Sequence, residues 1–314
     1  MPDKTAFLFP GQGSQSVGMV REVSRYPEAV AVFRQANEML SFDLFALCLT
    51  GSEERLNQDF YAQLAVHVTN VAFYAILEKK GIVPQVASGF SLGIFSALVA
   101  AGSLRFPQGL EGVKMAAEKM AEEGRIHRGA MAAVIGLAEQ EVAKICEDIP
   151  SAFVASVNTA RQVVVSGESG AVEKAIRLCQ ERGALLAKRL PIGWAIHTPL
   201  MKRASQAFAE AIQGWEILPP RFPVISYLRG DFLKTPEEIR DDLCAQFSHP
   251  NRWHQVLLRM VSEGVDRFIE VGPGRVLIQM MQWVHRQGQG LAMEDLLKSG
   301  FPLSWERASR RGRE

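Results

Sequence analysis

The stretch Val86–Gly93 reads VASGFSLG, and it decides the fold class of the chain. Its first four residues are typical of a short buried strand, and its last five match the pattern Gly-x-Ser-x-Gly. In a nucleophile elbow, this pattern places a serine on a tight strand-to-helix turn whose glycines avoid Cβ clashes. We therefore expect Ser91 to be an exposed nucleophile, with the backbone N–H of Leu92 available to an oxyanion. The alternative is a chance match at a helix start, and the preceding strand argues against it.

Strands and helices alternate on both sides of this motif. A strand is predicted over Thr5–Phe9, ending at the turn sequence Pro10-Gly11-Gln12-Gly13. Helices are predicted over residues 18–40, 53–58, 62–79, 91–101 and 110–123, and a strand over residues 84–90. This alternation indicates an α/β fold with a mostly parallel sheet.

The middle of the chain has a different order of elements. Strands are predicted over residues 130–137, 152–158, 162–166 and 185–190, and helices over residues 139–148 and 170–182. The resulting order β-α-β-β-α-β is that of a ferredoxin-like unit. We therefore expect residues 128–197 to form a small inserted domain.

Alternation resumes after the insertion. Helices are predicted over residues 198–214, 237–247 and 253–263, strands over residues 223–228 and 267–271, and a last helix after Gly272-Pro273-Gly274. Residues 1–127 and 198–314 are thus expected to form one discontinuous large domain, and residues 307–314, RASRRGRE, a frayed basic tail.

Composition excludes several classes of protein. The chain has 314 residues, a net charge of +1, 47% apolar residues and 22% charged residues. It is too apolar for a disordered protein and too evenly charged for a strongly basic nucleic-acid binder. Its length suggests two domains with a core that needs no covalent staples.

Cysteine usage and the apolar segments indicate a cytoplasmic protein. Four scattered cysteines form no Cys-x-x-Cys pair, which argues against disulfides and a zinc site: Cys48, Cys146, Cys179 and Cys244. The N-terminus has no signal-peptide pattern. The most membrane-like stretch, residues 90–104, is shorter than the ~18–20 residues that a spanning helix needs. We therefore expect a buried helix there and no membrane association.

A serine nucleophile needs a base, and histidine is the usual one. Of the six histidines, His197 differs from His67, His127, His249, His254 and His285 because it lies at the predicted boundary between the domains. Active sites often lie at such boundaries. Gln12 follows the first strand in a glycine-rich turn, which is either a simple tight turn or part of an oxyanion hole.

Four ordered motifs carry a resemblance to a known family: FPGQGSQ at residues 9–15, GFSLG at 89–93, HTPLM at 197–201 and EVGPG at 270–274. Together they resemble malonyl-CoA:acyl-carrier-protein transacylases and the acyltransferase domains of polyketide synthases. The resemblance covers about residues 4–285. It implies an α/β-hydrolase-like large domain carrying the ferredoxin-like insertion.

The resemblance also implies a ping-pong acyl transfer from a coenzyme A thioester to the phosphopantetheine thiol of an acyl carrier protein. Ser91 would carry the acyl group, and His197 would be the base. The oxyanion hole would use Gln12 and the Leu92 N–H, and the backbone carbonyl of Gln246 would orient the histidine. No metal or permanently bound cofactor is implied. Asn158 matches a common asparagine of the small domain to which no role is assigned.

The chain departs from the family pattern around the acyl group. Phe90 and Ile94 stand where the family has histidine and glutamate. Ala116 stands where malonyl-specific members have an arginine that pairs with the malonyl carboxylate. The residues before the base, which help to select the acyl chain, form a bulky apolar set: Trp194, Ala195 and Ile196.

These departures suggest an uncharged acyl group, either acetyl or a longer chain, because burying an unpaired carboxylate costs several kcal/mol. The alternative is an ordinary malonyl transferase in which another cation substitutes, the candidates being Lys119, Arg125 and Arg128. Lys114 would point to a different side of its helix, about 200° away.

Two further functions stay open. If water replaces the carrier thiol, the chain is an acyl hydrolase that clears acyl-carrier proteins, and a non-catalytic carrier-docking subunit is a third possibility. A classical esterase is less favoured because no aspartate between Ser91 and His197 can be assigned as the triad acid. The expected partner is an acidic carrier protein, for which four basic residues near His197 are candidates: Lys188, Arg189, Lys202 and Arg203.

Overall fold

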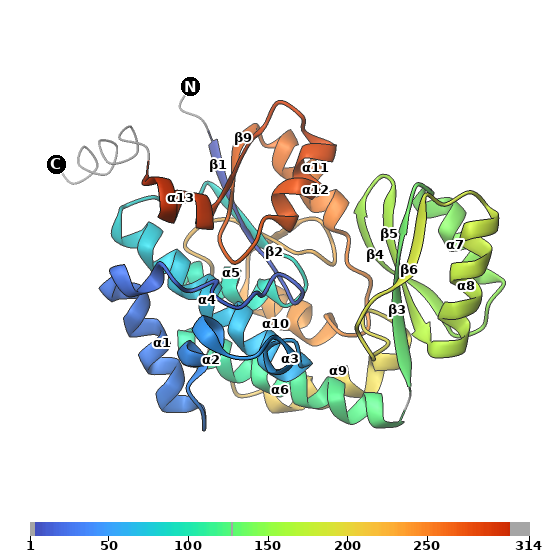
Figure 1. The fold of residues 1–314 in the computed structure, drawn as a ribbon, viewed down its shortest axis with the longest axis horizontal. Coiled ribbons are helices and arrows are strands. Elements are labelled where there is room, and N and C mark those ends of the chain that lie inside the picture. The colour runs from blue at the N-terminus through green and yellow to red at the C-terminus, as the bar shows by residue number, and fades with distance from the viewer. Residues whose placement is uncertain (1–3, 127, 302–314) are drawn as a thin grey trace.

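A computed structural model describes residues 4–126 and 128–301, in which two separate sheets are present (Figure 1). The larger sheet has six strands in the order β10-β9-β1-β2-β7-β8. All its pairings are parallel except that of β7 with β8. Its strands are β1 (Lys4–Phe9), β2 (Val86–Gly89), β7 (Val224–Ile225), β8 (Phe232–Leu233), β9 (Val265–Glu270) and β10 (Gln289–Ala292). The predicted α/β class with a mostly parallel sheet is therefore confirmed.

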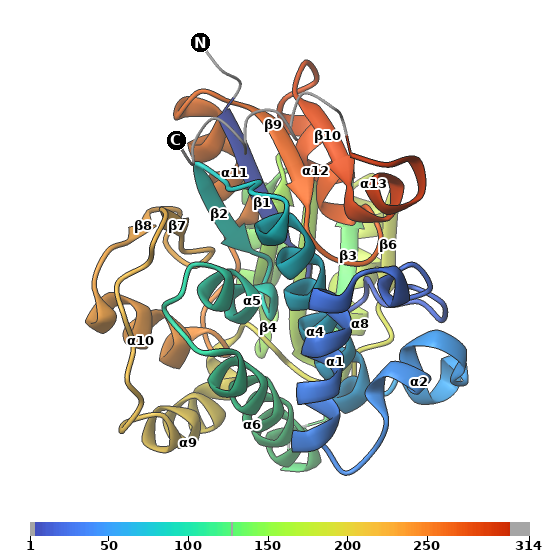
Figure 2. The ribbon, with the colours of Figure 1, turned by 90° about the vertical axis from the view of Figure 1, so that its left-hand side faces the viewer.

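Helices cover this sheet and bury its apolar strands. Helix α5 (Gly93–Ala100) packs against β1 and β2, whereas α11 (Trp253–Ser262) and α12 (Val276–Val284) pack against β9 (Figure 2). Helix α4 (Asp59–Lys79) contacts α1 (Pro27–Met39), α5 and α6 (Phe106–Ile126). The remaining helices outside residues 129–189 of the described chain have ten residues or fewer: α2 (Leu44–Thr50), α3 (Glu53–Leu56), α9 (Lys202–Ala211), α10 (Pro236–Ala245) and α13 (Met293–Ser299).

The second sheet has four antiparallel strands in the order β4-β5-β3-β6. Its elements follow one another as the sequence predicts: β3 (Gly129–Ile135), α7 (Glu139–Glu147), β4 (Ala152–Thr159), β5 (Gln162–Glu168), α8 (Ser169–Glu181) and β6 (Leu186–Arg189). The two helices and the sheet enclose a hydrophobic core of their own. In Figure 1 this unit lies on the right of the molecule.

A short loop joins the two sheets through backbone hydrogen bonds. The Asn251 N–H donates to the Ala155 carbonyl at 2.8 Å, and the Val157 N–H donates to the Asn251 carbonyl at 2.8 Å. An ion pair between Arg252 and Glu139, 2.7 Å long, lies at the same junction. The loop before α11 is thereby held against β4.

Several predicted boundaries were wrong. The helix predicted from residue 18 begins at Pro27, because Gly18 has a φ of +89° and a single 3-10 turn, Val23–Arg25, intervenes. Helix α2, the edge strands β8 and β10, and α13 were not predicted. The helix predicted from residue 198 begins with a 3-10 turn at Pro199–Met201. The basic tail predicted over residues 307–314 lies outside the described residues.

Helix α4 is the one helix in the described part of the chain that is long and apolar enough to cross a membrane. Most of its apolar window, 83%, is buried inside the protein, as in the core helix of a soluble fold. The uncharged stretch after Ser91 forms α5, whose residues are nearly all buried.

Two glycines allow the elbow to pack closely on the first strand. A Cβ on Gly93 would lie 2.0 Å from the Phe9 carbonyl oxygen, and a Cβ on Gly89 would lie 2.0 Å from the Gly93 carbonyl carbon. Because these neighbours are backbone atoms, no side-chain rotation relieves the clash. The glycine pattern therefore brings the turn at Ser91 against the loop after β1.

Candidate active site

Ser91 and His197 both adopt a backbone conformation that is rare for residues with a Cβ. Their φ angles are +52° and +64°, and Ser151 is the only other non-glycine residue with positive φ in the described chain. Such strain costs of order 1–3 kcal/mol and clusters at functional sites. Ser91 lies between β2 and α5, as the elbow pattern predicts, and His197 follows the small sheet.

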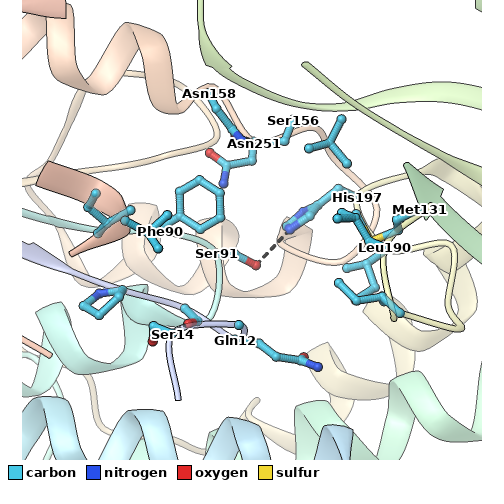
Figure 3. Close-up of a pocket in the computed structure, with 18 of the residues that line it drawn as sticks. Gln12, Ser14, Phe90, Ser91, Met131, Ser156, Asn158, Leu190, His197 and Asn251 are labelled. Atoms are coloured by element: carbon cyan, nitrogen blue, oxygen red, sulfur yellow. Dashed lines mark hydrogen bonds between the residues drawn. The ribbon is translucent and has the colours of Figure 1, made fainter. Parts of the chain in front are cut away.

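The side chains of Ser91 and His197 are in contact although they lie 106 residues apart in the sequence. Ser91 Oγ lies 2.8 Å from His197 Nε2 (Figure 3). The imidazole is buried, with 6% of the residue exposed, and stands edge-on to Tyr227 at 5.9 Å between ring centroids. This is the geometry in which a neutral imidazole accepts the serine proton.

Backbone groups orient the histidine. His197 Nδ1 lies 3.1 Å from the His249 carbonyl oxygen, and the His197 backbone N–H donates to the Phe247 carbonyl at 2.7 Å. A proton on Nδ1 that donates to this carbonyl leaves Nε2 free to accept from Ser91. The described loop supplies no carboxylate to this nitrogen.

Gln246, the residue predicted to orient the histidine, lies in the same loop and is buried. A hydrogen bond with its backbone raises the pKa of His197, as does the one with the His249 backbone. The Gln246 side chain donates to the Leu243 carbonyl at 2.8 Å. No sequence pattern points to His249, because any residue can supply a backbone carbonyl.

Two backbone N–H groups near Ser91 are available to an oxyanion. Neither Gln12 nor Leu92 donates its backbone N–H within the described structure. Both residues line a small cavity together with Ser91. The Gln12 side chain donates from Nε2 to Asp59 Oδ1.

Two cavities open from Ser91 and His197. The larger, about 250 Å³, is lined by residues of the small sheet, of α12 and of the loops after β1 and β2, including Phe90, Met131, Ser156, Asn158, Leu190 and Asn251 (Figure 3). The smaller, about 40 Å³, is lined by Gln12, Gln63, Ser91, Leu92, Ala116, Met120, Ile196, His197, Gln246 and Phe247. Ser91 and His197 thus line both the larger and the smaller cavity.

The structure separates the predicted pocket residues into two groups. Phe90, Ala116 and Ile196 line one or both cavities. Three others are elsewhere: Ile94 and Ala195 are buried outside the cavity walls, and Trp194 packs over Gly124. The sequence analysis also missed Gln63, whose buried amide has no hydrogen-bond partner in the described structure.

None of the three basic candidates for binding a carboxylate lines either cavity, and neither does Lys114: the candidates are Lys119, Arg125 and Arg128. Lys119 Nζ instead lies 3.0 Å from Glu122, and Lys114 Nζ lies 3.8 Å from Glu111. In the described residues, no group of three or more His, Cys, Asp or Glu is placed to hold a metal.

Comparison with known proteins decides the family. The acyl transferase domain family matches residues 6–299. The chain belongs to this family. It is 36% identical to the malonyl CoA-acyl carrier protein transacylase of Bacillus subtilis over 297 residues, which are 93% of this chain and 94% of that protein. It is 37% identical to the Escherichia coli K12 enzyme of the same name over 277 residues, 87% and 90% of the two chains.

Solved structures agree. The malonyl CoA-acyl carrier protein transacylase of Coxiella burnetii superposes with a TM-score of 0.92 at 35% identity, covering 95% of this chain and 97% of its own. A malonyl-transacylase in complex with a type II polyketide synthase acyl-carrier protein gives 0.90 at 31% identity, covering 95% and 100%. The chain is therefore an acyltransferase, as the four motifs predicted.

Burial changes the pKa of the His197 imidazole in this acyltransferase. Desolvation lowers the pKa of His197 to about 4, and hydrogen bonds with the backbones of His249 and Gln246 act in the opposite direction without reversing the shift. His197 is therefore neutral and able to accept a proton at any pH well above 4. The buried His67, whose pKa falls to about 3, contacts Ser96 and lines neither cavity.

The rate of Ser91 acylation should consequently stay constant as the pH falls from 8 to about 5 and drop with a midpoint near pH 4, the folded pKa of His197. Stability should fall over part of the same range. Between pH 6.5 and about 4 the unfolded chain binds a proton that the folded His197 excludes. Stopped-flow acylation after a pH jump measures the rate before unfolding, and a midpoint near 6.5 would contradict the assignment.

Proposed function

We propose that this acyltransferase moves an acyl group from coenzyme A to an acyl carrier protein through an ester on Ser91. The observation that carries the proposal is the 2.8 Å contact between the strained Ser91 and the backbone-oriented His197. The names of the curated relatives and the structure of a related transacylase bound to its carrier protein support the same donor and acceptor.

The first half-reaction forms the acyl-enzyme. Ser91 Oγ attacks the thioester carbonyl while His197 Nε2 takes the hydroxyl proton. The N–H groups of Gln12 and Leu92 stabilise the resulting oxyanion. The intermediate then collapses, the carbon–sulfur bond breaks, and His197 returns the proton to the coenzyme A sulfur.

The second half-reaction repeats these steps with the carrier thiol. His197 takes the thiol proton, the sulfur attacks the Ser91 ester, and Oγ leaves with the proton from Nε2. Because one site serves both thiols in turn, the kinetics are ping-pong. Coenzyme A is a substrate, and the mechanism needs no bound cofactor.

Two domains frame this site. We describe residues 1–127 and 198–314 as an α/β-hydrolase-like domain and residues 128–197 as a ferredoxin-like insertion. The antiparallel order β4-β5-β3-β6 with two helices supports the second description. The larger cavity lies between the small sheet and the loops that follow β1 and β2, and it suits the pantetheine arm.

The surface near the cleft supports a carrier partner in part. All four predicted basic residues are exposed. However, Arg189 lies 3.0 Å from Glu173, and Arg203 lies 3.2 Å from Glu123. We assign the main attraction for an acidic carrier to Lys188 and Lys202.

The small chamber beside Ala116 bears on the acyl group. At about 40 Å³ it has room for only a few heavy atoms, and its polar walls are neutral groups of glutamine, serine and histidine. A malonyl carboxylate placed there would lack a cation and lose several kcal/mol of solvation. We therefore propose a short uncharged acyl group, such as acetyl, as the preferred substrate.

Transfer is tested with acetyl-CoA and a phosphopantetheinylated carrier protein. The wild-type enzyme should give acetyl-carrier protein, and Ser91→Ala should lower the rate by at least about a thousandfold while the fold is retained. Mass spectrometry of the carrier measures the product. Release of free acetate without carrier labelling would replace the transferase by a hydrolase, and full activity of Ser91→Ala would favour a non-catalytic role for this site.

Acyl selectivity is tested by Ala116→Arg. A guanidinium at this position pairs with a malonyl carboxylate through charge-assisted hydrogen bonds, so kcat/KM for malonyl-CoA relative to acetyl-CoA should rise by about tenfold to a hundredfold. Ala116→Leu is the matched control, because it fills the chamber without a charge and should not raise this ratio. A wild-type enzyme that already prefers malonyl-CoA would contradict the proposal.

A further inference from the structure

The loop that follows β1, residues 10–15, forms side-chain hydrogen bonds with one other segment of the chain, residues 57–70. Asn70 Nδ2 donates to the Pro10 carbonyl at 2.9 Å, at the start of the loop. Gln15 Nε2 donates to Asn57 Oδ1 at 2.9 Å, at its end. Between these two anchors, Gln12 donates to Asp59. The segment around the start of α4 therefore fixes the loop at three points.

The Ser14 hydroxyl also donates to the Gly11 carbonyl at 2.9 Å, and Gly11 packs on the Phe90 backbone, but neither contact involves Gln12. Gly13 has a φ of +100°, and a Cβ at that position would meet no atom within 4 Å. The Gly13 N–H bonds only to Gln15, a neighbour within the same loop. A loop of this kind samples many conformations unless a side chain binds it to the body of the protein.

Asp59 is suited to that task. It is the first residue of α4, a helix of 21 residues, where the helix dipole stabilises a carboxylate. Its hydrogen bond with Gln12 is charge-assisted when the carboxyl group is ionised, and such bonds are stronger than neutral ones. Figure 3 shows the amide group of Gln12 directed away from Ser91. The side chain is thus engaged elsewhere, and the backbone N–H is the part of Gln12 left for the oxyanion.

We infer that Asp59 is a positioning residue, which holds the Gln12 side chain and thereby fixes the Gln12 backbone N–H in the oxyanion hole. This inference rests on the function proposed above for Gln12. Because the oxyanion exists only in the transition state and the intermediate, loss of the tether should lower kcat and leave KM almost unchanged.

The test compares Asp59→Leu with Asp59→Asn. Leucine removes the acceptor and keeps the branched shape of the side chain, so kcat for Ser91 acylation should fall by about tenfold to a hundredfold with KM within about threefold of wild type. Asparagine keeps an oxygen that accepts from Gln12, and kcat should recover to within about fivefold of wild type. An unchanged kcat in Asp59→Leu, an equal rise in KM, or an equal loss in both variants would overturn the inference.

A double-variant cycle tests whether Asp59 acts through Gln12. Gln12→Ala removes the donor, so adding Asp59→Leu to it should cause no further loss of kcat. Independent, multiplicative losses would show that Asp59 acts by another route. If Asp59→Leu fails to fold, Asp59→Ala takes its place, because alanine also removes the acceptor, and an unchanged kcat in that variant would overturn the inference.

Asp43→Leu is the stability control. Asp43 caps α2 by accepting from the Ala46 N–H at 2.9 Å, far in sequence from the loop after β1. Its replacement should lower the melting temperature and leave kcat unchanged. A matching fall of kcat in Asp43→Leu would show that general destabilisation explains the effect at Asp59.

The substrate separates this inference from the proposed function. Rates are measured with p-nitrophenyl acetate, which acylates serine without coenzyme A or carrier, and with acetyl-CoA. An enzyme that reacts with the ester and transfers nothing from acetyl-CoA overturns the proposed function, and the ester rates of the variants still decide the role of Asp59.

Discussion

The active site depends on how closely the turn at Ser91 packs on the end of β1. Glycine at position 93 permits that contact, because a Cβ there would overlap the Phe9 backbone, and glycine at position 89 lets the turn close on the backbone of Gly93. The packing holds Ser91 at a φ of +52° and brings its hydroxyl to within 2.8 Å of His197. It also places the loop that carries Gln12 beside the N–H of Leu92. Strain at the serine is thus stabilised by the buried contacts of the central strands.

A second loop, residues 247–251, orients the His197 imidazole. This loop accepts the backbone N–H of His197, faces Nδ1 with the His249 carbonyl, and pairs with β4 through Asn251. A carbonyl orients the imidazole without adding a negative charge, and burial keeps the imidazole neutral by lowering its pKa to about 4. The same loop therefore bonds both to His197 and to β4 of the small sheet.

The sequence predicted the parts of this site that depend on local pattern. Glycine spacing and the preceding apolar strand identified Ser91, and the β-α-β-β-α-β order identified the small unit. The position of His197 between domains made it the best of the six histidines. The elbow pattern suggested Leu92 and the glycine-rich turn suggested Gln12 for an oxyanion hole, the resemblance implied the same roles, and both stay predictions. Edge strands of two to four residues, such as β8 and β10, were not predicted because such short strands depend on pairing with the neighbouring strand rather than on a pattern of their own.

Residues whose importance depends on tertiary contacts could not be predicted, because the local sequence does not show which groups the fold brings together. The His249 carbonyl carries no side-chain signal, and Asp59 is one acidic residue at a helix start among many. Gln63 lies on an apolar helix and becomes notable only because its buried amide is unpaired beside Ala116. Conversely, the resemblance to the family made Ile94, Ala195 and Trp194 candidates for the acyl pocket, yet they lie outside the cavity walls.

The proposal that Ser91 carries a short uncharged acyl group can be tested on the enzyme itself. The measurement is the intact mass of the enzyme, with peptide mapping of Ser91, after brief exposure to an equimolar mixture of acetyl-CoA and malonyl-CoA. We expect the acetyl adduct to predominate on Ser91, since the cavity beside Ala116 offers no cation to a carboxylate. A predominant malonyl adduct would contradict it.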